Sequence, residues 1–197
     1  RIGQTGVLAL RGRWFNSFGD FPDFHFFGGN GDMRGFEYLE FIGHEAGHVN
    51  AELRFPLIEA MLTPIGVLGG IRGTFFFNMG GASLNGTPFK LSSGSTEVFT
   101  PVTGFVREGV VLPDGSVGLQ TVPTFGPEQS VSGFRLVDTR AAYGIGLTTF
   151  VIGFPAHFDW SWRTLFNRDW EDVLFASQGG SADYRKPRFD FWIGYDF

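Results

Sequence analysis

The chain has 197 residues and a formal net charge of −5, with 30 Gly, 25 Phe, 5 Trp and no Cys. We interpret residues 1–197 as one domain, because this length is enough for a single core. The lack of Cys excludes disulfides and thiolate metal sites, and the lack of a basic block argues against a nucleic-acid partner. No run reaches the ~18 apolar residues of a membrane-spanning helix. The aromatic content nevertheless exceeds what a core of this size needs, which indicates that part of it faces an apolar environment.

Polar and apolar residues alternate with a period of two in six segments, whereas helical periodicity is almost missing. Each segment predicts a β-strand with one apolar and one polar face. In chain order, the segments are residues 6–15, 49–57, 71–79, 137–150, 154–163 and 189–197. The sequence therefore predicts an all-β fold.

Two long connections interrupt this series of strands. The first, from Gly81 to Gly133, is rich in Gly, Ser and Pro. Within it, residues 105–111 and 117–122 flank a Pro-Asp-Gly turn at 113–115, and we predict a hairpin there. The second connection, residues 165–188, can contain a short helix, and we expect its acidic residues to face solvent.

The polar faces of the predicted strands carry charges of both signs between glycines, whereas the apolar faces are rich in aromatic residues. Strands of outer-membrane barrels alternate in this way, with apolar side chains toward lipid and polar side chains toward the lumen. Short and long connections also alternate along the chain, as they do in such barrels. The pattern favours an antiparallel transmembrane β-barrel with long extracellular loops, and a soluble β-sandwich is the alternative.

A glycine-rich stretch follows the first predicted strand, and residues 28–36 read Gly-Gly-Asn-Gly-Asp-Met-Arg-Gly-Phe. Glycine permits the positive φ angles of a tight loop, so an ordinary turn is one interpretation. The arginine, however, stands in an apolar frame that is unusual for a solvated loop. We therefore expect the loop to fold back into the protein interior, where the guanidinium finds acceptors. The candidate residues of this loop motif are Gly28, Gly29, Met33, Arg34, Gly35 and Phe36.

These features together resemble the C-terminal barrel of the BamA-type outer-membrane assembly and translocation superfamily, also called the bacterial surface antigen family. The sixth extracellular loop of that family carries a (V/I)RG(F/Y) motif, which here reads Met-Arg-Gly-Phe at 33–36. The family's next strand is similar to the string Asn-Ala-Glu-Leu-Arg-Phe-Pro-Leu at 50–57. A later Phe-x-Asp-x-Gly motif corresponds to residues 76–80, with Asn78 in place of the aspartate.

The resemblance implies that the six strands are the last six of a sixteen-stranded barrel. It also implies that Arg34 docks on the lumenal face of the strand that carries Phe76, Asn78 and Gly80. Because Asn78 is neutral, we expect its carbonyl oxygen to accept a hydrogen bond from Arg34 in place of the family's ion pair. The last strand resembles the terminal signal that is read during insertion into the outer membrane. The residues of this signal are Phe189, Phe191, Ile193, Tyr195 and Phe197.

The function that the resemblance implies is the insertion or translocation of proteins at the bacterial outer membrane, without enzymatic activity and without a cofactor. The implied partners are outer-membrane lipids, client outer-membrane or secreted proteins, and periplasmic domains upstream in the same chain. Since the sequence opens with Arg1 and no signal peptide, we expect a fragment of a longer chain. A passive structural barrel that keeps the fold without insertase activity is an alternative.

A second alternative comes from His44, Glu45 and His48, which fit the H-E-x-x-H signature of zinc peptidases. On a helix, the two histidines would lie about 6 Å apart along the axis and bind one zinc ion, with the glutamate as general base. Gly43 and Gly47 weaken a helix, however, and the alternation of the second predicted strand begins at the next residue. In an extended segment the two histidines are about 13 Å apart, too far to share a metal ion.

Overall fold

The computed structural model of the chain describes residues 6–63, 66–84, 86–111, 113, 116–151 and 154–194. The chain divides into two compact units, each formed by segments that are distant in the sequence. Unit 1 is built from Arg1–Ser92, Leu136–Thr164 and Lys186–Phe197, and unit 2 from Ser93–Arg135 and Leu165–Arg185. Because the chain leaves unit 1 twice and returns to it each time, no single linker in the sequence separates the two units.

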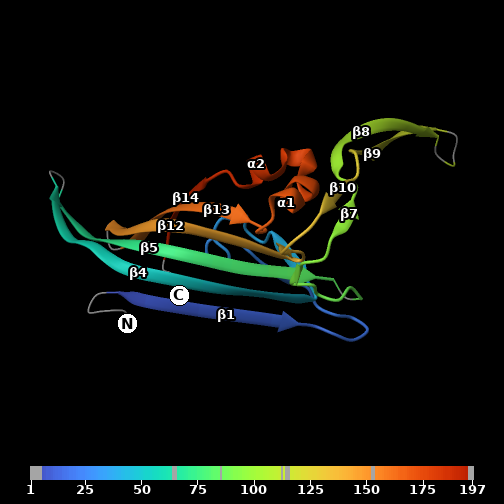
Figure 1. Cartoon of the computed structure of the whole chain (residues 1–197). Helices are drawn as coiled ribbons and strands as arrows, with labels where there is room; N and C mark the ends of the chain where they lie inside the picture. Colours follow the sequence, from blue (N-terminus) through green and yellow to red (C-terminus); the bar gives the residue numbers. More distant parts are fainter. Residues whose placement is uncertain are drawn as a thin grey trace. The chain divides into compact units, whose positions relative to one another are not determined.

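Unit 1 is organised around a six-stranded antiparallel sheet with the strand order β1-β4-β5-β12-β13-β14 (Figure 1). The strands are β1 (Val7–Asn16), β4 (Glu45–Thr63), β5 (Gly66–Ser83), β12 (Thr139–Val151), β13 (Phe154–Thr164) and β14 (Arg188–Ile193). Each of the six alternating segments contributes one of these strands, so the predicted β-strand series is confirmed. Residues 195–197, at the end of the last predicted strand, lie outside the described residues.

β4 and β5 extend well beyond the alternating segments, and contain 19 and 18 residues. The register shifts between Pro56, which pairs with Arg72, and Ile58, which pairs with Ile71. Leu57 is therefore the extra residue of a bulge, and such a residue reverses the inward and outward alternation beyond it. This reversal explains why the alternating pattern ends at Leu57 although the strand continues.

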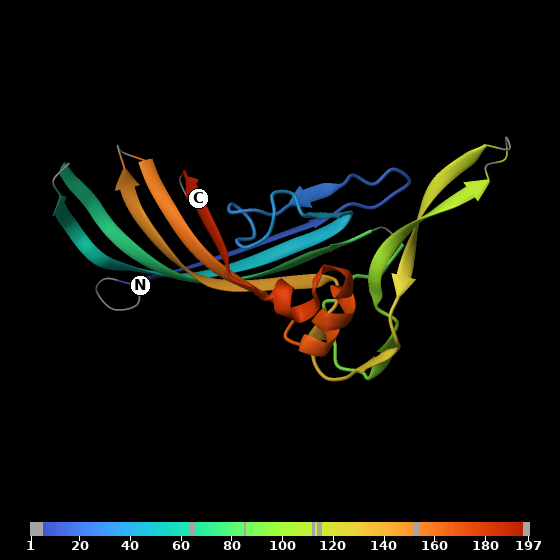
Figure 2. The ribbon, with the colours of Figure 1, turned by 90° about the horizontal axis from the view of Figure 1, so that it is seen from above.

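The connection between β1 and β4 lies on the concave side of the curved sheet (Figure 2). We call the sheet face that it covers the inner face. The connection contains a short pair of strands, β2 (His25–Phe27) and β3 (Phe41–Gly43). Its buried aromatic and methionine side chains pack on small residues of the sheet. Together these residues form the apolar core of unit 1. The members of this core are Phe27, Met33, Phe36, Phe41, Ala46 and Ala142.

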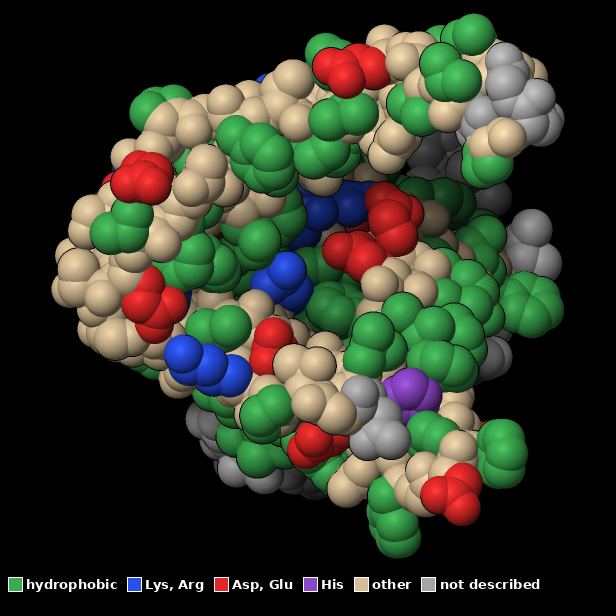
Figure 3. All heavy atoms as spheres, turned by 90° about the vertical axis from the view of Figure 1, so that its right-hand side faces the viewer, with side chains coloured by type: hydrophobic (Ala, Val, Ile, Leu, Met, Phe, Trp, Pro, Cys, Tyr) green, Lys and Arg blue, Asp and Glu red, His purple; other side chains and the backbone are tan. Residues whose placement is uncertain are grey.

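The two faces of the sheet differ in burial, with polar residues covered and hydrophobic residues exposed. On the inner face, Asn78 and Asp159 are 0% and 1% exposed, whereas Phe75 and Phe191 on the outer face are 53% and 54% exposed. Many hydrophobic side chains likewise lie at the molecular surface in Figure 3. Large hydrophobic residues exposed on the outer face include Leu8, Leu10, Val49, Phe75, Tyr143, Ile145, Leu147, Phe154, Phe189, Phe191 and Ile193.

Unit 2 contains a hairpin and two shorter strand pairs. β8 (Val102–Val111) and β9 (Val117–Phe125) pair in an antiparallel manner, so the predicted hairpin is confirmed. Asp114 and Gly115 of its turn lie outside the described residues. The shorter pairs are β7 (Glu97–Phe99) with β10 (Gln129–Val131), and β6 (Ser92–Ser93) with β11 (Arg135–Leu136) at the boundary of the two units.

The second long connection contains helical segments, as predicted. They are α1 (Arg168–Leu174), the 3₁₀ helix η1 (Ala176–Gln178) and α2 (Gly180–Tyr184). The expectation that its acidic residues face solvent is wrong for Glu171, which is 0% exposed. Its carboxylate accepts hydrogen bonds from the backbone N–H of Leu165 at 2.7 Å and from Arg185 at 3.0 Å. A buried carboxylate needs such partners, and they stand six and fourteen residues away in the sequence.

Candidate functional site

The loop motif has the backbone geometry that its glycines permit. Gly28, Gly29 and Gly35 have φ angles of 135°, 79° and 85°. The N–H of Met33 donates to the carbonyl oxygen of Gly29 at 2.7 Å, which closes the turn. At Gly35, a Cβ atom would lie 2.7 Å from Oγ of Ser161, so only glycine lets the loop approach β13 this closely.

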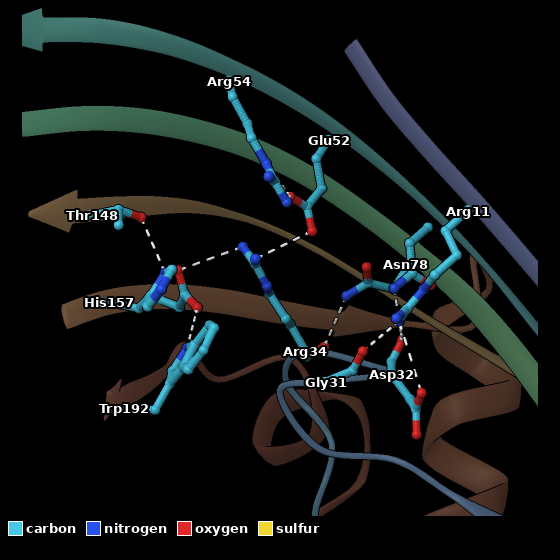
Figure 4. Close-up of polar contacts among 12 residues, drawn as sticks. Arg11, Gly31, Asp32, Arg34, Glu52, Arg54, Asn78, Thr148, His157 and Trp192 are labelled. Carbon is cyan, nitrogen blue, oxygen red and sulfur yellow. Dashed lines mark hydrogen bonds and ion pairs between the residues drawn. The ribbon is translucent and has the colours of Figure 1, made fainter. Parts of the chain in front are cut away.

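Arg34 is held on the inner face by carboxylates from two strands. Its side chain is 3% exposed, and Nη2 lies 3.1 Å from Oε1 of Glu52 on β4 (Figure 4). Nη1 lies 3.7 Å from Oδ1 of Asp159 on β13. The guanidinium also lies over the ring of Phe76, 5.1 Å from its centroid. The predicted approach of Arg34 to the strand of Phe76 is therefore present, but its ion pairs are made with β4 and β13.

Asn78 contacts this loop in a different way from the sequence-based expectation. The side chain is 0% exposed, and Nδ2 donates a hydrogen bond to the backbone carbonyl of Arg34 at 3.2 Å. The expectation that the Asn78 carbonyl accepts from the guanidinium is wrong, because the guanidinium is directed to Glu52 and Asp159. The neutral amide thus binds the loop backbone, and the charge of Arg34 is compensated elsewhere.

Three side chains in one cross-strand row of the sheet bind the carbonyl groups of three different loop residues. The row runs across β1, β4 and β5, whose residues pair directly in the register. The pairs are Arg11 with Gly31, Asn50 with Asp32 at 2.7 Å, and Asn78 with Arg34 at 3.2 Å. Because the donors are spaced by the sheet, they fix the path of the loop backbone across it.

Asp32 is a further anchor of the loop that the sequence interpretation missed. Its Oδ1 lies 3.8 Å from Arg11, 3.6 Å from Arg13 and 3.7 Å from His48. The loop therefore presents one negative and one positive side chain, Asp32 and Arg34, to opposite charges on the sheet. The charges on the polar faces of the strands were the sequence signal for these contacts. Which of these charges lies opposite the loop depends on the register of the strands.

Gly80 lies next to the loop motif, as expected. A Cβ atom there would lie 3.0 Å from Sδ of Met33 and 2.7 Å from Cβ of His48. The missing side chain thus makes room for the buried methionine. The terminal strand residues lie apart from this site, because Phe189, Phe191 and Ile193 are exposed on the outer face of β14. Tyr195 and Phe197 lie outside the described residues.

The H-E-x-x-H segment is extended. Glu45 and His48 lie in β4, and His44 directly precedes that strand. His48 is 3% exposed and faces Asp32, whereas the ring of His44 packs on Phe24 with the centroids 4.2 Å apart. The helix that would bring both histidines to one metal ion is not formed here. Within the described part of the chain, no group of three or more His, Asp or Glu side chains is placed to hold a metal ion.

Comparison with known proteins adds no relative. No family model matches the chain, and neither a curated protein nor a solved structure matches it. Among the described residues, no helix has the length and apolar character needed to cross a membrane.

Proposed function

We propose that this chain forms part of the wall of a β-barrel in the bacterial outer membrane, as the last six strands of a sixteen-stranded barrel. In this proposal the parent protein inserts or translocates other proteins at that membrane. The outer face of the sheet contacts lipid, and the inner face lines the lumen. The loop motif is a brace inside the lumen, held there through Arg34.

The observation that carries the proposal is the opposite burial of the two faces. Contiguous apolar patches on soluble monomers rarely exceed a few hundred Å², and larger ones mark interaction surfaces. Here exposed aromatic and aliphatic side chains extend across all six strands. A lipid environment makes this distribution favourable, because the exposed side chains replace a water contact by a hydrocarbon contact.

The connections support the same proposal. Only two residues separate β4 from β5, and only two separate β12 from β13. The connections at the other end of the sheet, 17–44, 84–138 and 165–187, are much longer. Barrels of the outer membrane have short turns on the periplasmic side and long loops outside. The loop motif belongs to the long-connection end, as the sixth extracellular loop does in the resembling family.

Membrane placement can be tested with neighbouring residues of β1, because the chain contains no cysteine. Ala9→Cys places a fluorescent label on the inner face, and Leu10→Cys places it on the outer face, where Leu10 is 72% exposed. In vesicles, lipids that carry a nitroxide in the acyl chain should quench the label at Leu10 and spare the label at Ala9. Aqueous iodide should have the opposite preference. Equal quenching at the two positions would contradict a lipid-facing outer surface.

The insertase activity needs a separate test in the full-length parent protein. The parent in vesicles should speed the assembly of an unfolded outer-membrane client, and Arg34→Ala should lower that rate while the barrel remains folded. A folded, lipid-embedded parent that does not change the assembly rate would support the passive structural barrel instead.

A further inference from the structure

A small cavity lies on the inner face of the sheet, beside the Glu52 carboxylate that Arg34 and Arg54 share. Its volume is about 120 Å³, and it is lined from four neighbouring strands. Its polar lining residues are Arg54 on β4, Arg72 and Thr74 on β5, Thr148 on β12 and His157 on β13. These side chains belong to two adjacent cross-strand rows. In the row of Arg54 and Thr74, the next strand contributes Gly146, and the carboxylate of Asp159 fills the space that a side chain there would take.

The charges around this cavity do not balance. Arg34 and Arg54 are compensated by Glu52 and Asp159, since each arginine forms an ion pair within this set. Arg72 adds a further positive charge to the cavity wall. Among the described residues, no acidic side chain forms an ion pair with Arg72. The cavity therefore has an excess of positive charge, and this favours an anion.

The cavity also has a hydrogen-bond donor that the protein does not use. Thr74 is 6% exposed as a residue, and within the described ranges its hydroxyl forms no hydrogen bond. Its hydroxyl oxygen remains accessible to solvent, so it is available to a ligand. Thr148 and His157, in contrast, bind each other at 3.0 Å and form a fixed part of the wall (Figure 4).

Two of the lining side chains, Arg54 and His157, are held in place by further contacts. Nε and Nη2 of Arg54 both donate to Oε2 of Glu52, at 2.8 and 2.6 Å. His157 stacks on Trp192 with the ring centroids 3.7 Å apart, and Nε2 contacts the carbonyl oxygen of Gly194 at 3.0 Å. Arg54 and His157 therefore have defined positions in the cavity wall, whereas Arg72 is exposed.

We propose that this cavity is a binding site for a compact oxyanion, a carboxylate or a phosphate group, held by Arg72, Arg54 and the hydroxyl of Thr74. Arginine binds both groups through paired N–H donors. A volume of about 120 Å³ is enough for such a group. The site does not depend on whether the outer face of the sheet contacts lipid, so this proposal and the proposed function can fail separately.

The test is a calorimetric titration of the full chain in detergent with inorganic phosphate, with chloride adjusted to keep the ionic strength constant. We expect saturable binding that Arg72→Gln weakens about tenfold or more, because a charge-assisted contact is lost. Thr74→Val should weaken binding several-fold without a change in charge. Arg107→Gln, at an exposed position of β8, is the matched control and should have no effect. Unchanged circular dichroism would show that each variant is folded.

Competition then identifies the source of the oxyanion. A short peptide with a free C-terminal carboxylate and the same peptide with an amidated C-terminus are added to the phosphate-loaded protein. Displacement by the free form alone would assign the site to chain-terminal carboxylates, and displacement by neither would assign it to phosphate. The proposal is overturned if phosphate does not bind saturably to the parent chain, or if Arg72→Gln and Thr74→Val both bind it as the parent does.

Discussion

Asn78 holds the backbone of Arg34 and leaves its charge to other residues. Nδ2 of Asn78 donates to the Arg34 carbonyl oxygen at 3.2 Å, inside a region where both side chains are at most 3% exposed. The guanidinium meanwhile pairs with Glu52 at 3.1 Å. Position 78 therefore requires a donor, and an aspartate there would offer only acceptors at neutral pH.

The first prediction is that Asn78→Asp loosens the loop. The substitution removes the hydrogen bond to the Arg34 carbonyl and adds a buried negative charge, which should lower the free energy of unfolding by about 1–3 kcal/mol. Hydrogen exchange of residues 28–36 should become faster. Asn16→Asp, which adds the same charge at an exposed position of β1, is the control. Slower exchange in Asn78→Asp would mean that the carboxylate pairs with the guanidinium after all.

The second prediction concerns the ion pair of Arg34 with Glu52. Both side chains are 3% exposed, so Glu52→Gln removes a carboxylate partner from the buried charge of Arg34 and from the half-buried charge of Arg54. Removal of one partner of a buried pair costs about 3–5 kcal/mol. Chemical denaturation in detergent should show this loss, whereas Glu108→Gln on the exposed part of β8 should change the unfolding free energy by less than about 0.5 kcal/mol. An equal, small effect of both substitutions would exclude a structural role for the pair.

The sequence predicted the strands well, because alternation is a local property. Residues 49–57 alternate cleanly, and they form a part of β4 that ends at the bulge. The bulge itself could not be foreseen, since it is defined by the pairing of Pro56 and Ile58 with β5. The continuation of β4 beyond residue 57 could not be predicted for the same reason.

The loop motif was predicted in position but only partly in its contacts. The apolar frame of Arg34 correctly indicated burial, because Met33 and Phe36 are 0% and 4% exposed. Its carboxylate partners stand 18 and 125 positions further along the chain, as Glu52 and Asp159. Several charged residues on the polar faces could have filled that role. Only the register of the sheet selects the two that lie opposite the loop.

The third prediction tests the outer face at Phe158, which lies in the middle of β13 and pairs with Phe191 of β14. If this face meets the bilayer midplane, Phe158→Arg should cost about 2–4 kcal/mol in unfolding from lipid vesicles. Phe105→Arg, at a 64% exposed position of the hairpin in unit 2, is the control for the added charge. A cost below about 0.5 kcal/mol at Phe158 would place this face outside the lipid.

The fourth prediction concerns Gly35, where the loop crosses β13. The residue has a φ angle of 85°, and a Cβ atom would lie 2.7 Å from Oγ and 3.0 Å from Cβ of Ser161. Gly35→Ala therefore combines an unfavourable backbone conformation with a contact that forces the loop away from the sheet. We expect a loss of about 1–3 kcal/mol in unfolding free energy.

Gly31 provides the matched control for this substitution, because a Cβ atom there would meet nothing within 4 Å. Gly31→Ala should be neutral or slightly stabilising, since alanine restricts the unfolded chain. Combining Gly35→Ala with Ser161→Gly should recover part of the stability, because the second change removes both contacting atoms of the serine. A double variant no more stable than Gly35→Ala would assign the whole cost to the backbone angle. Gly35→Ala with parent stability would mean that the loop does not rest against β13.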